Sequence, residues 1–138
     1  MQVKYSVTNS SIPNAGNGLF AQRFIPKGSV VWAFDRDNLV VYTRKGIETY
    51  LASLPYEKAC KYAAHVYRDT VIGNEYAVYE LDDGRYFNHS GNPNVANQGE
   101  NCVAARDIQR GEELLIDYEQ LYPRWLHILH DKYNVFRP

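Results

Sequence analysis

The sequence has few cysteines, no long apolar run and no excess of charge of either sign. Its 138 residues include only Cys60 and Cys102, too few for a disulfide framework or a cysteine-rich zinc site, so we expect a reducing, intracellular location. No apolar run approaches the roughly 20 residues that span a bilayer, and the first residues lack the apolar region of a secretory signal. We therefore expect a protein that is neither secreted nor bound to a membrane.

Charge is balanced along the chain. With 15 basic and 16 acidic residues, the formal net charge is −1. A protein that binds nucleic acid directly carries a basic stripe, so we expect no direct nucleic-acid partner. Hydrophobic residues make up 45% and charged residues 22%, as in an ordinary globular protein. Residues 1–138 suffice for one hydrophobic core but not for two, which predicts a single domain.

Apolar periodicity predicts a mostly β fold with a helical insert. The strand-like segments are residues 3–7, 18–23, 29–34, 76–81, 102–105 and 113–118. Residues 44–67 instead repeat apolar side chains at helical spacing, from Ile47 to Leu54 and again from Ala59 to Val66. The insert is therefore expected to contain two helices.

Residues 119–138 form the closing segment of the chain. Trp125 and Leu129 have the spacing of a short C-terminal helix. His127 and His130 lie on neighbouring turns of this helix and could in principle bind a metal ion together. No third ligand stands nearby in the sequence, so we interpret both as surface or hydrogen-bonded histidines and predict no metal site.

The most informative stretch is residues 84–94, where an aromatic pair runs into small and polar residues. Tyr86 and Phe87 favour burial, and Asn88 and His89 add hydrogen-bond donors and acceptors. The glycine and proline that follow exclude a regular helix or a central strand. A polar irregular segment beside aromatic rings is typical of a small-molecule site. A solvated turn after a strand has the same composition and remains the alternative.

Two further segments accompany this stretch. Gly16, Asn17 and Gly18 form a small loop in which the absent side chains would let a ligand lie against the backbone, although Asn-Gly is also an ordinary turn signal. Residues 111–118 read Gly-Glu-Glu-Leu-Leu-Ile-Asp-Tyr and end at Tyr118.

Together the segments 16–21, 85–94 and 111–118 resemble, in this order, the three signature blocks of SET-domain lysine methyltransferases. The resemblance covers roughly residues 3–118. It implies a fold of small curved β-sheets in which the Asn-His segment forms a pseudoknot with the last strands. It also implies S-adenosyl-L-methionine as cofactor and a lysine-containing protein or peptide as substrate, with histone tails among the candidates.

The same resemblance implies roles for individual residues. The residues expected at the cofactor are Gly16, Asn17, Gly18, Arg85, Phe87, Asn88, His89 and Tyr118. The residues expected around the substrate lysine are Tyr118 and Tyr76 as catalytic tyrosines, with Tyr76, Tyr86 and Ile116 lining its channel.

The chemistry of methyl transfer agrees with a tyrosine-rich site. The lysine amine must be neutral to displace the methyl group directly. Its ordinary pKa is ~10.4, so a neutral amine near pH ~7.5 needs a shift of about three units, or roughly 4 kcal/mol. A dry aromatic channel lowers the pKa by desolvation, and the positive charge of the cofactor lowers it further. The 12 tyrosines of the chain are unusually many and could supply such a wall.

The sequence departs from the family pattern at three places. Gly91 replaces the cysteine that usually follows Asn-His-Ser, no cysteine-rich zinc segment follows the core, and Ile116 stands where Phe or Tyr is usual. Two alternatives to an active enzyme therefore stay open. One is a SET-fold module that binds a peptide or partner without transferring methyl groups, and the other is an unrelated β-rich binding protein.

Overall fold

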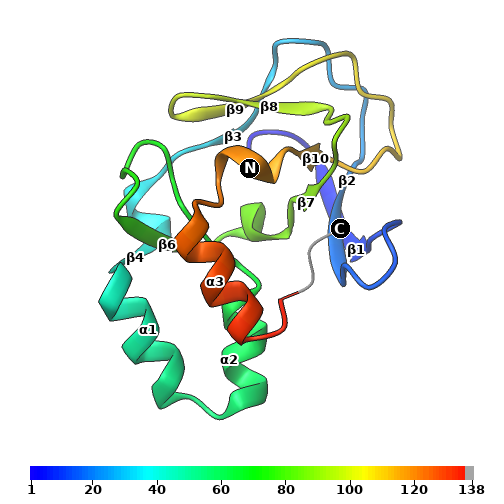
Figure 1. Cartoon of the computed structure of the whole chain (residues 1–138). Helices are drawn as coiled ribbons and strands as arrows, with labels where there is room; N and C mark the ends of the chain where they lie inside the picture. Colours follow the sequence, from blue (N-terminus) through cyan, green and yellow to red (C-terminus); the bar gives the residue numbers. More distant parts are fainter. Residues whose placement is uncertain (136–138) are drawn as a thin grey trace.

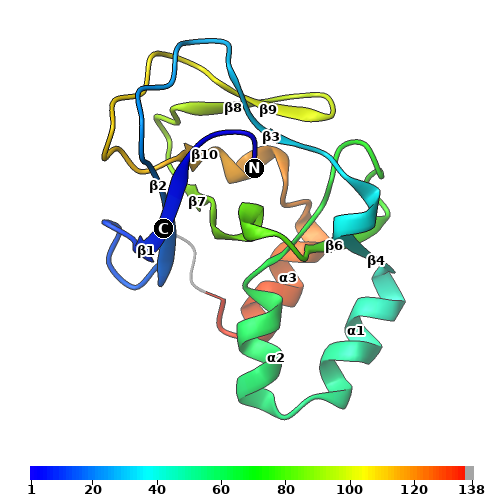
Figure 2. The same ribbon diagram turned by 180° about the vertical axis from the view of Figure 1, so that it is seen from behind.

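The computed structural model describes residues 1–135, which form small β-sheets and short helices (Figures 1 and 2). Strands β1 (Tyr5–Asn9) and β2 (Asn17–Ala21) pair in antiparallel fashion. Strands β7 (Asn88–His89) and β10 (Leu115–Ile116) pair in parallel. Because parallel neighbours cannot be joined by a tight turn, the chain between these two strands makes a long excursion before it returns.

That excursion contributes most of a three-stranded antiparallel sheet. Strand β9 (Asn101–Ala104) lies between β8 (Val95–Gln98) and β3 (Val30–Ala33). The register of β3 against β9 shifts between Val30 and Trp32, so that both Val31 and Trp32 are buried. A bulge of this kind re-aims side chains, and here it turns Trp32 toward the cavity described below.

The second three-stranded sheet is antiparallel and carries the helical insert. Its central strand β6 (Tyr76–Glu80) pairs with β4 (Leu39–Thr43) and β5 (Val66–Tyr67). Helices α1 (Arg44–Ser53) and α2 (Tyr56–Ala63) connect β4 to β5. In Figures 1 and 2 these helices gather at one end of the molecule, away from β3, β8 and β9.

Local sequence explains where α1 begins and which face it buries. The Thr43 side chain accepts a hydrogen bond from Gly46 N at 3.0 Å and caps the helix. Ile47 and Leu51 are buried, as their spacing of four residues predicts. Pro55 occupies the N-cap of α2, which begins at Tyr56.

The closing helix α3 (Arg124–Lys132) packs beside α2 and buries Leu126, Leu129 and His130. His130 is fully buried, and its Nε2 lies 3.0 Å from the Val66 carbonyl oxygen. It therefore helps to fasten α3 to β5. Within residues 1–135 no group of three potential metal-ligating side chains is found together, and none of the helices there is long and apolar enough to cross a bilayer.

The buried side chains form two hydrophobic clusters. The β cluster contains residues of β2, β3, β8 and β9 together with Phe87 and Ile116. The helical cluster contains residues of α1, α2 and α3 together with Val66. Tyr67 and Tyr122 pack against both clusters, so they mark the place where the two meet.

The prediction of a mostly β fold with a helical insert and a short C-terminal helix is confirmed. Two details were wrong. The second insert helix ends at Ala63 and not at Val66, because Val66 and Tyr67 pair with β6. The strand expected over 113–118 is only two residues long, and the 3-10 helix η3 (Tyr118–Gln120) follows it.

Candidate active site

Residues 88–94 and 113–118 are locked together by hydrogen bonds, as expected of the pseudoknot. Ser90 N donates to Ile116 O at 2.9 Å. The buried side chain of Asn94 donates to Glu113 O and accepts from Leu115 N, both at 2.8 Å. Asn94 therefore satisfies one donor and one acceptor of the opposite segment, as a neighbouring strand would. Two segments far apart in the sequence are held at a fixed distance.

The Glu113 carboxylate joins this knot to the N-terminal loop. It accepts hydrogen bonds from Ser10 Oγ at 2.7 Å, Ser11 N at 3.0 Å, Ser11 Oγ at 2.5 Å and Asn88 Nδ2 at 3.1 Å. Asn88 Nδ2 also donates to Asn17 O at 2.9 Å. Burial would raise the pKa of Glu113, but the hydrogen bonds from the two serines and Asn88 outweigh it and hold the pKa below its ordinary value. All three sequence motifs meet at this carboxylate.

The same carboxylate explains why residue 18 is glycine. A Cβ at Gly18 would lie 2.2 Å from Glu113 Oε1 and 3.2 Å from Asn88 Nδ2. Gly16 differs, since its φ of +75° favours glycine and open space surrounds the position of a Cβ. Of the two glycines predicted to hold the cofactor, Gly18 is required by packing inside the protein and Gly16 faces space that a ligand could use.

His89 and Tyr118 form the next part of the site. Tyr118 N donates to His89 Nδ1 at 3.0 Å, so a neutral imidazole carries its hydrogen on Nε2. The Tyr118 hydroxyl donates to the carbonyl oxygen of Phe87. Burial and, next, the negative charge of Glu113 raise the pKa of Tyr118, which keeps the hydroxyl protonated. The phenol is thus fixed in position and in the direction of its proton.

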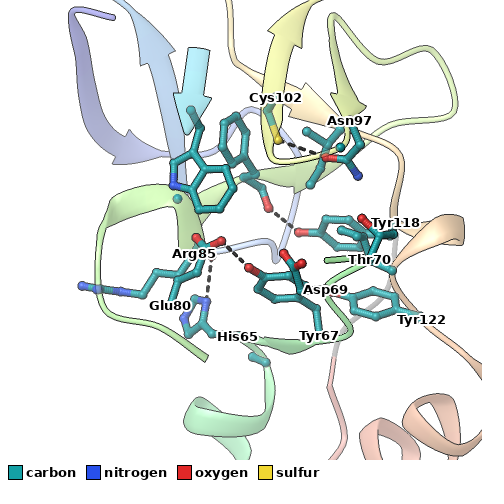
Figure 3. A pocket seen from close by; sticks show the side chains of 17 residues that line it. His65, Tyr67, Asp69, Thr70, Glu80, Arg85, Asn97, Cys102, Tyr118 and Tyr122 are labelled. Carbon is teal, nitrogen blue, oxygen red and sulfur yellow. Dashed lines mark hydrogen bonds between the residues drawn. The ribbon is translucent and has the colours of Figure 1, made fainter. Parts of the chain in front are cut away.

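A cavity of about 60 Å³ lies beside Tyr118, at the junction of the two hydrophobic clusters (Figure 3). This is several times the roughly 15 Å³ that one water molecule needs. Its walls are mainly apolar or aromatic and carry a few polar groups. The residues that line it include Trp32, Tyr67, Asp69, Glu80, Arg85, Phe87, Cys102, Ile116, Tyr118 and Tyr122.

Tyr67 lines the same cavity, near Tyr118 (Figure 3). Its hydroxyl donates to Glu80 Oε1, and Glu80 is only 5% exposed. Burial and, next, the neighbouring Glu80 carboxyl raise the pKa of Tyr67 well above its ordinary value. The sequence reasoning missed Tyr67 because Val66 and Tyr67 follow the helical insert. The signal that could have found it is a β-branched and aromatic pair just beyond the last helical turn.

The structure places two of the predicted channel residues elsewhere. Tyr76 is 41% exposed on β6 opposite Thr43 and does not line the cavity. Tyr76 is the first residue of β6, at its exposed end, whereas Glu80 at the other end of the same strand lines the cavity. Tyr86 is half-buried, with its ring 4.6 Å from the Arg85 guanidinium, and is likewise not among the lining residues.

Four predicted site residues do meet at the cavity. These are Arg85, Phe87, Ile116 and Tyr118. The Arg85 guanidinium donates to Leu81 O at 2.9 Å and to the Tyr86 hydroxyl at 3.1 Å, so its role in the structure is to fasten the segment that precedes the knot. Asn17 and Asn88 lie together at the Glu113 carboxylate, as described above.

Comparisons with known proteins agree with this architecture. A candidate histone methyltransferase of Plasmodium falciparum has a similar fold, with a TM-score of 0.57 and 22% identity over 91% of this chain and 99% of its own. The ctPRC2 complex in an autoinhibited conformation, bound to S-adenosylmethionine, gives a TM-score of 0.71 and 19% identity over 97% of this chain.

The match covers only 17% of the ctPRC2 chain, so the present chain is similar to a small part of that protein. An apo form of ctPRC2 in an autoinhibited state gives a TM-score of 0.70 and 19% identity. A comparison with curated sequences produced no match. The SET domain family model, however, matches residues 16–119, which span all three motifs and every residue that lines the cavity except Leu121 and Tyr122. The chain therefore belongs to the SET-domain family.

Proposed function

We propose that this chain is a protein-lysine N-methyltransferase that uses S-adenosyl-L-methionine. The observation that carries the proposal is the cavity in which two half-buried tyrosines, Tyr67 and Tyr118, both donate their hydroxyl protons into the protein. Each hydroxyl oxygen can then act as an acceptor toward the cavity, even though Tyr118 also bonds to the side chain of Tyr122. A site with two hydrogen-bond acceptors and aromatic walls suits a neutral alkyl amine, which brings two N–H groups and one lone pair.

The residues around Asn88 fit the cofactor by their chemistry. Gly16 leaves open backbone surface, Asn17 is exposed, and His89 is left with an N–H at Nε2. These groups can donate to and accept from the amino-acid and ribose parts of the cofactor. When bound, S-adenosyl-L-methionine supplies a methyl group on a positively charged sulfur.

The protein contributes positioning and desolvation to the reaction. The apolar walls formed by Phe87 and Ile116 disfavour the charged ammonium and so lower the pKa of the lysine amine. The two tyrosine oxygens accept its N–H groups and leave the nitrogen lone pair free to attack. Holding nucleophile and methyl group in line is an entropic contribution that a rigid channel supplies. In this proposal Tyr67 takes the channel position that the sequence had suggested for Tyr76.

Labelled methyl transfer tests the proposal. The chain is incubated with methyl-labelled S-adenosyl-L-methionine, core histones and an array of lysine-containing peptides, and methyllysine is identified by mass spectrometry. Cofactor affinity is measured separately by calorimetry. Cofactor binding together with methyllysine formation supports the proposal, whereas a chain that binds peptides but forms no methyllysine is the inactive binding module.

Tyr118→Phe is the matched variant for this assay. It keeps the ring and removes the hydroxyl that donates to Phe87 O. Losing one orienting group in a desolvated site costs about 2–4 kcal/mol in the transition state, or roughly a hundredfold in rate. A rate within about threefold of wild type would show that the Tyr118 hydroxyl does not act on the amine.

A further inference from the structure

Two groups of hydrogen bonds lie side by side at the wall of the cavity, one at Glu80 and one at Asp82. The Tyr67 hydroxyl donates to Glu80 Oε1. The Asp82 carboxylate accepts from Trp32 Nε1 at 3.0 Å and from Gly84 N at 2.8 Å. Four segments of the chain thus contribute to one wall: β3, β5, β6 and the start of the 3-10 helix η2 (Asp83–Tyr86).

Glu80 is seated tightly in this wall. A Cβ at Gly84 would lie 2.2 Å from Glu80 Oε2, 2.7 Å from Trp32 Nε1 and 2.8 Å from Asp82 Oδ1. These three polar atoms therefore crowd around the same point above Gly84. Among the described residues, Glu80 Oε2 accepts no hydrogen bond. A buried carboxyl in this setting gains a partner only when it is protonated, because Oε2–H can then donate to Asp82.

The direction of the Tyr67 proton matters for methyl transfer. A neutral amine has a single lone pair, and that lone pair must reach the methyl group. A hydroxyl that donates to the lone pair would occupy it, whereas a hydroxyl that accepts an N–H would leave it free. Tyr118 is held in the accepting direction by Phe87 O, and Tyr67 is held in the same direction by Glu80.

We propose, on the basis of the function proposed above, that Glu80 is a positioning residue that keeps the Tyr67 hydroxyl in the accepting direction toward the substrate amine. Glu80 acts through Tyr67 and does not touch the reacting atoms. Because Glu80 Oε2 is buried and has no hydrogen-bond partner among the described residues, the site favours the neutral carboxyl, which adds no negative charge that would hold the lysine as an ammonium ion.

The surroundings of Glu80 support its neutrality. The titratable groups that face it are Tyr67 on β5, Asp69 in the following loop, Asp82 at the start of η2 and Cys102 on β9. The pKa of Glu80 is raised to about 8, mainly by burial. The hydrogen bond from Tyr67 lowers this pKa, and the neighbouring Asp82 and Asp69 raise it further. A raised carboxyl pKa means that Glu80 is neutral below about pH 8 and ionised above it.

Glutamine at position 80 reproduces the neutral carboxyl. Its Oε1 can accept from Tyr67, and its Nε2–H can donate to Asp82. Glu80→Met has similar length and keeps the packing but provides no acceptor. Glu80→Gln is expected to fold, because it keeps both contacts without having to bind a proton. Glu75→Met, at an exposed position in the loop before β6, is the matched control.

The experiment measures methyl transfer to the arrayed lysine peptides for both Glu80 variants, for Tyr67→Phe and for the double variant Tyr67→Phe/Glu80→Met. Glu80→Met is expected to lower kcat by about tenfold or more with little change in cofactor affinity. Glu80→Gln is expected to restore kcat to within about threefold. Once the Tyr67 hydroxyl is absent, adding Glu80→Met should slow the enzyme no further.

A second measurement does not depend on activity. With tyrosines labelled at Cζ, the NMR signal of Tyr67 should shift with a midpoint near pH 8 as Glu80 ionises, and this shift should be absent in Glu80→Gln. Additive effects of Tyr67→Phe and Glu80→Met, or a Glu80→Gln variant as slow as Glu80→Met, would overturn the role of Glu80. Methyl transfer without the Tyr67 shift would overturn it as well. A wild-type chain that shows the shift but methylates no peptide would overturn the proposed function instead.

Discussion

Replacing Glu113 by alanine should uncouple the three motifs of the site. The carboxylate is 7% exposed and accepts four hydrogen bonds, two from Ser11, one from Ser10 and one from Asn88. The alanine variant leaves the loop that contains Gly16 attached to the knot mainly through Asn88 Nδ2 and Asn17 O. We therefore expect a loss of stability and a loss of cofactor affinity together.

The expected loss of unfolding free energy depends on whether each hydrogen-bond donor of Glu113 can bind water instead. A hydrogen bond to a charged acceptor contributes about 1.5–3 kcal/mol. Ser11 is exposed and its groups can turn to water, so most of its share is recovered, while Ser10 and Asn88 are half-buried and recover less. The sum is about 3 kcal/mol of unfolding free energy, which corresponds to a fall of roughly 10 °C in Tm for a chain of this size.

Glu112→Ala provides the matched control. Glu112 is the neighbouring residue, and its carboxylate pairs with the exposed Arg106 at 2.8 Å and accepts from Gln109 N at 2.6 Å. An exposed ion pair contributes about 0–1 kcal/mol, so this variant should lose little stability. Thermal unfolding and cofactor calorimetry on both variants check the prediction. Equal effects of Glu112→Ala and Glu113→Ala would refute the reasoning.

The pH dependence of the Glu113 effect has a defined sign. Hydrogen bonds hold the pKa of Glu113 below its ordinary value despite burial. A carboxyl with a lowered folded-state pKa stabilises the protein above its unfolded pKa of about 4.3 and loses that contribution as pH falls. The difference in stability between wild type and Glu113→Ala should therefore be largest near neutral pH and shrink below about pH 4.

Three further substitutions test the packing and the product specificity of the site. Gly18→Ala should displace the Glu113 carboxylate, because Oε1 would lie 2.2 Å from the new Cβ, and it should lower Tm by several degrees. Gly91→Ala is the control, since open space surrounds this position and its Tm should stay close to that of wild type. Ile116 leaves room in the cavity of about 60 Å³, so wild type should form di- and trimethyllysine. Ile116→Tyr fills part of this room with an aromatic ring and a hydroxyl, so the variant should form mainly monomethyllysine. Mass spectrometry at long reaction times decides this, and a wild-type product that stops at one methyl group would contradict it.

Periodicity in the sequence predicted which segments are helices or strands, but it did not predict that Tyr67 lines the cavity. Ile47 and Leu51 show their helical face directly, and both are buried. Tyr67 was hidden, because it belongs to a strand of two residues that exists only through pairing with β6. Short strands have too few residues to show an alternation, and their formation depends on tertiary partners. Tyr76, in a strand of five residues, was more visible, but it is exposed and does not line the cavity.

The motifs were also easier to find than the roles of their residues. The sequence suggested that Gly18 and Asn88 contact the cofactor, which stays a prediction, and the structure adds that both also lie against Glu113. A short motif records that a position tolerates few residues, and close packing restricts a position as strongly as a ligand does. The partners of Glu113 could not be predicted, because 103 residues separate it from Ser10 along the chain and only the fold brings the two together.

The position of the cavity links the stability of the fold to the chemistry of the site. Tyr67 contacts both hydrophobic clusters with its ring and donates to Glu80 with its hydroxyl. Phenylalanine would keep the ring contacts but leave the buried Glu80 carboxyl without its donor, which costs about 1–3 kcal/mol. Removing the carboxyl as well, in Tyr67→Phe/Glu80→Met, should therefore recover stability relative to Tyr67→Phe without recovering methyl transfer. The Tyr67 hydroxyl is thus needed both by the proposed reaction and by the buried Glu80. A substitution of Tyr67 alone should therefore lower stability and rate together, whereas changing Tyr67 and Glu80 together should restore stability and leave the rate low.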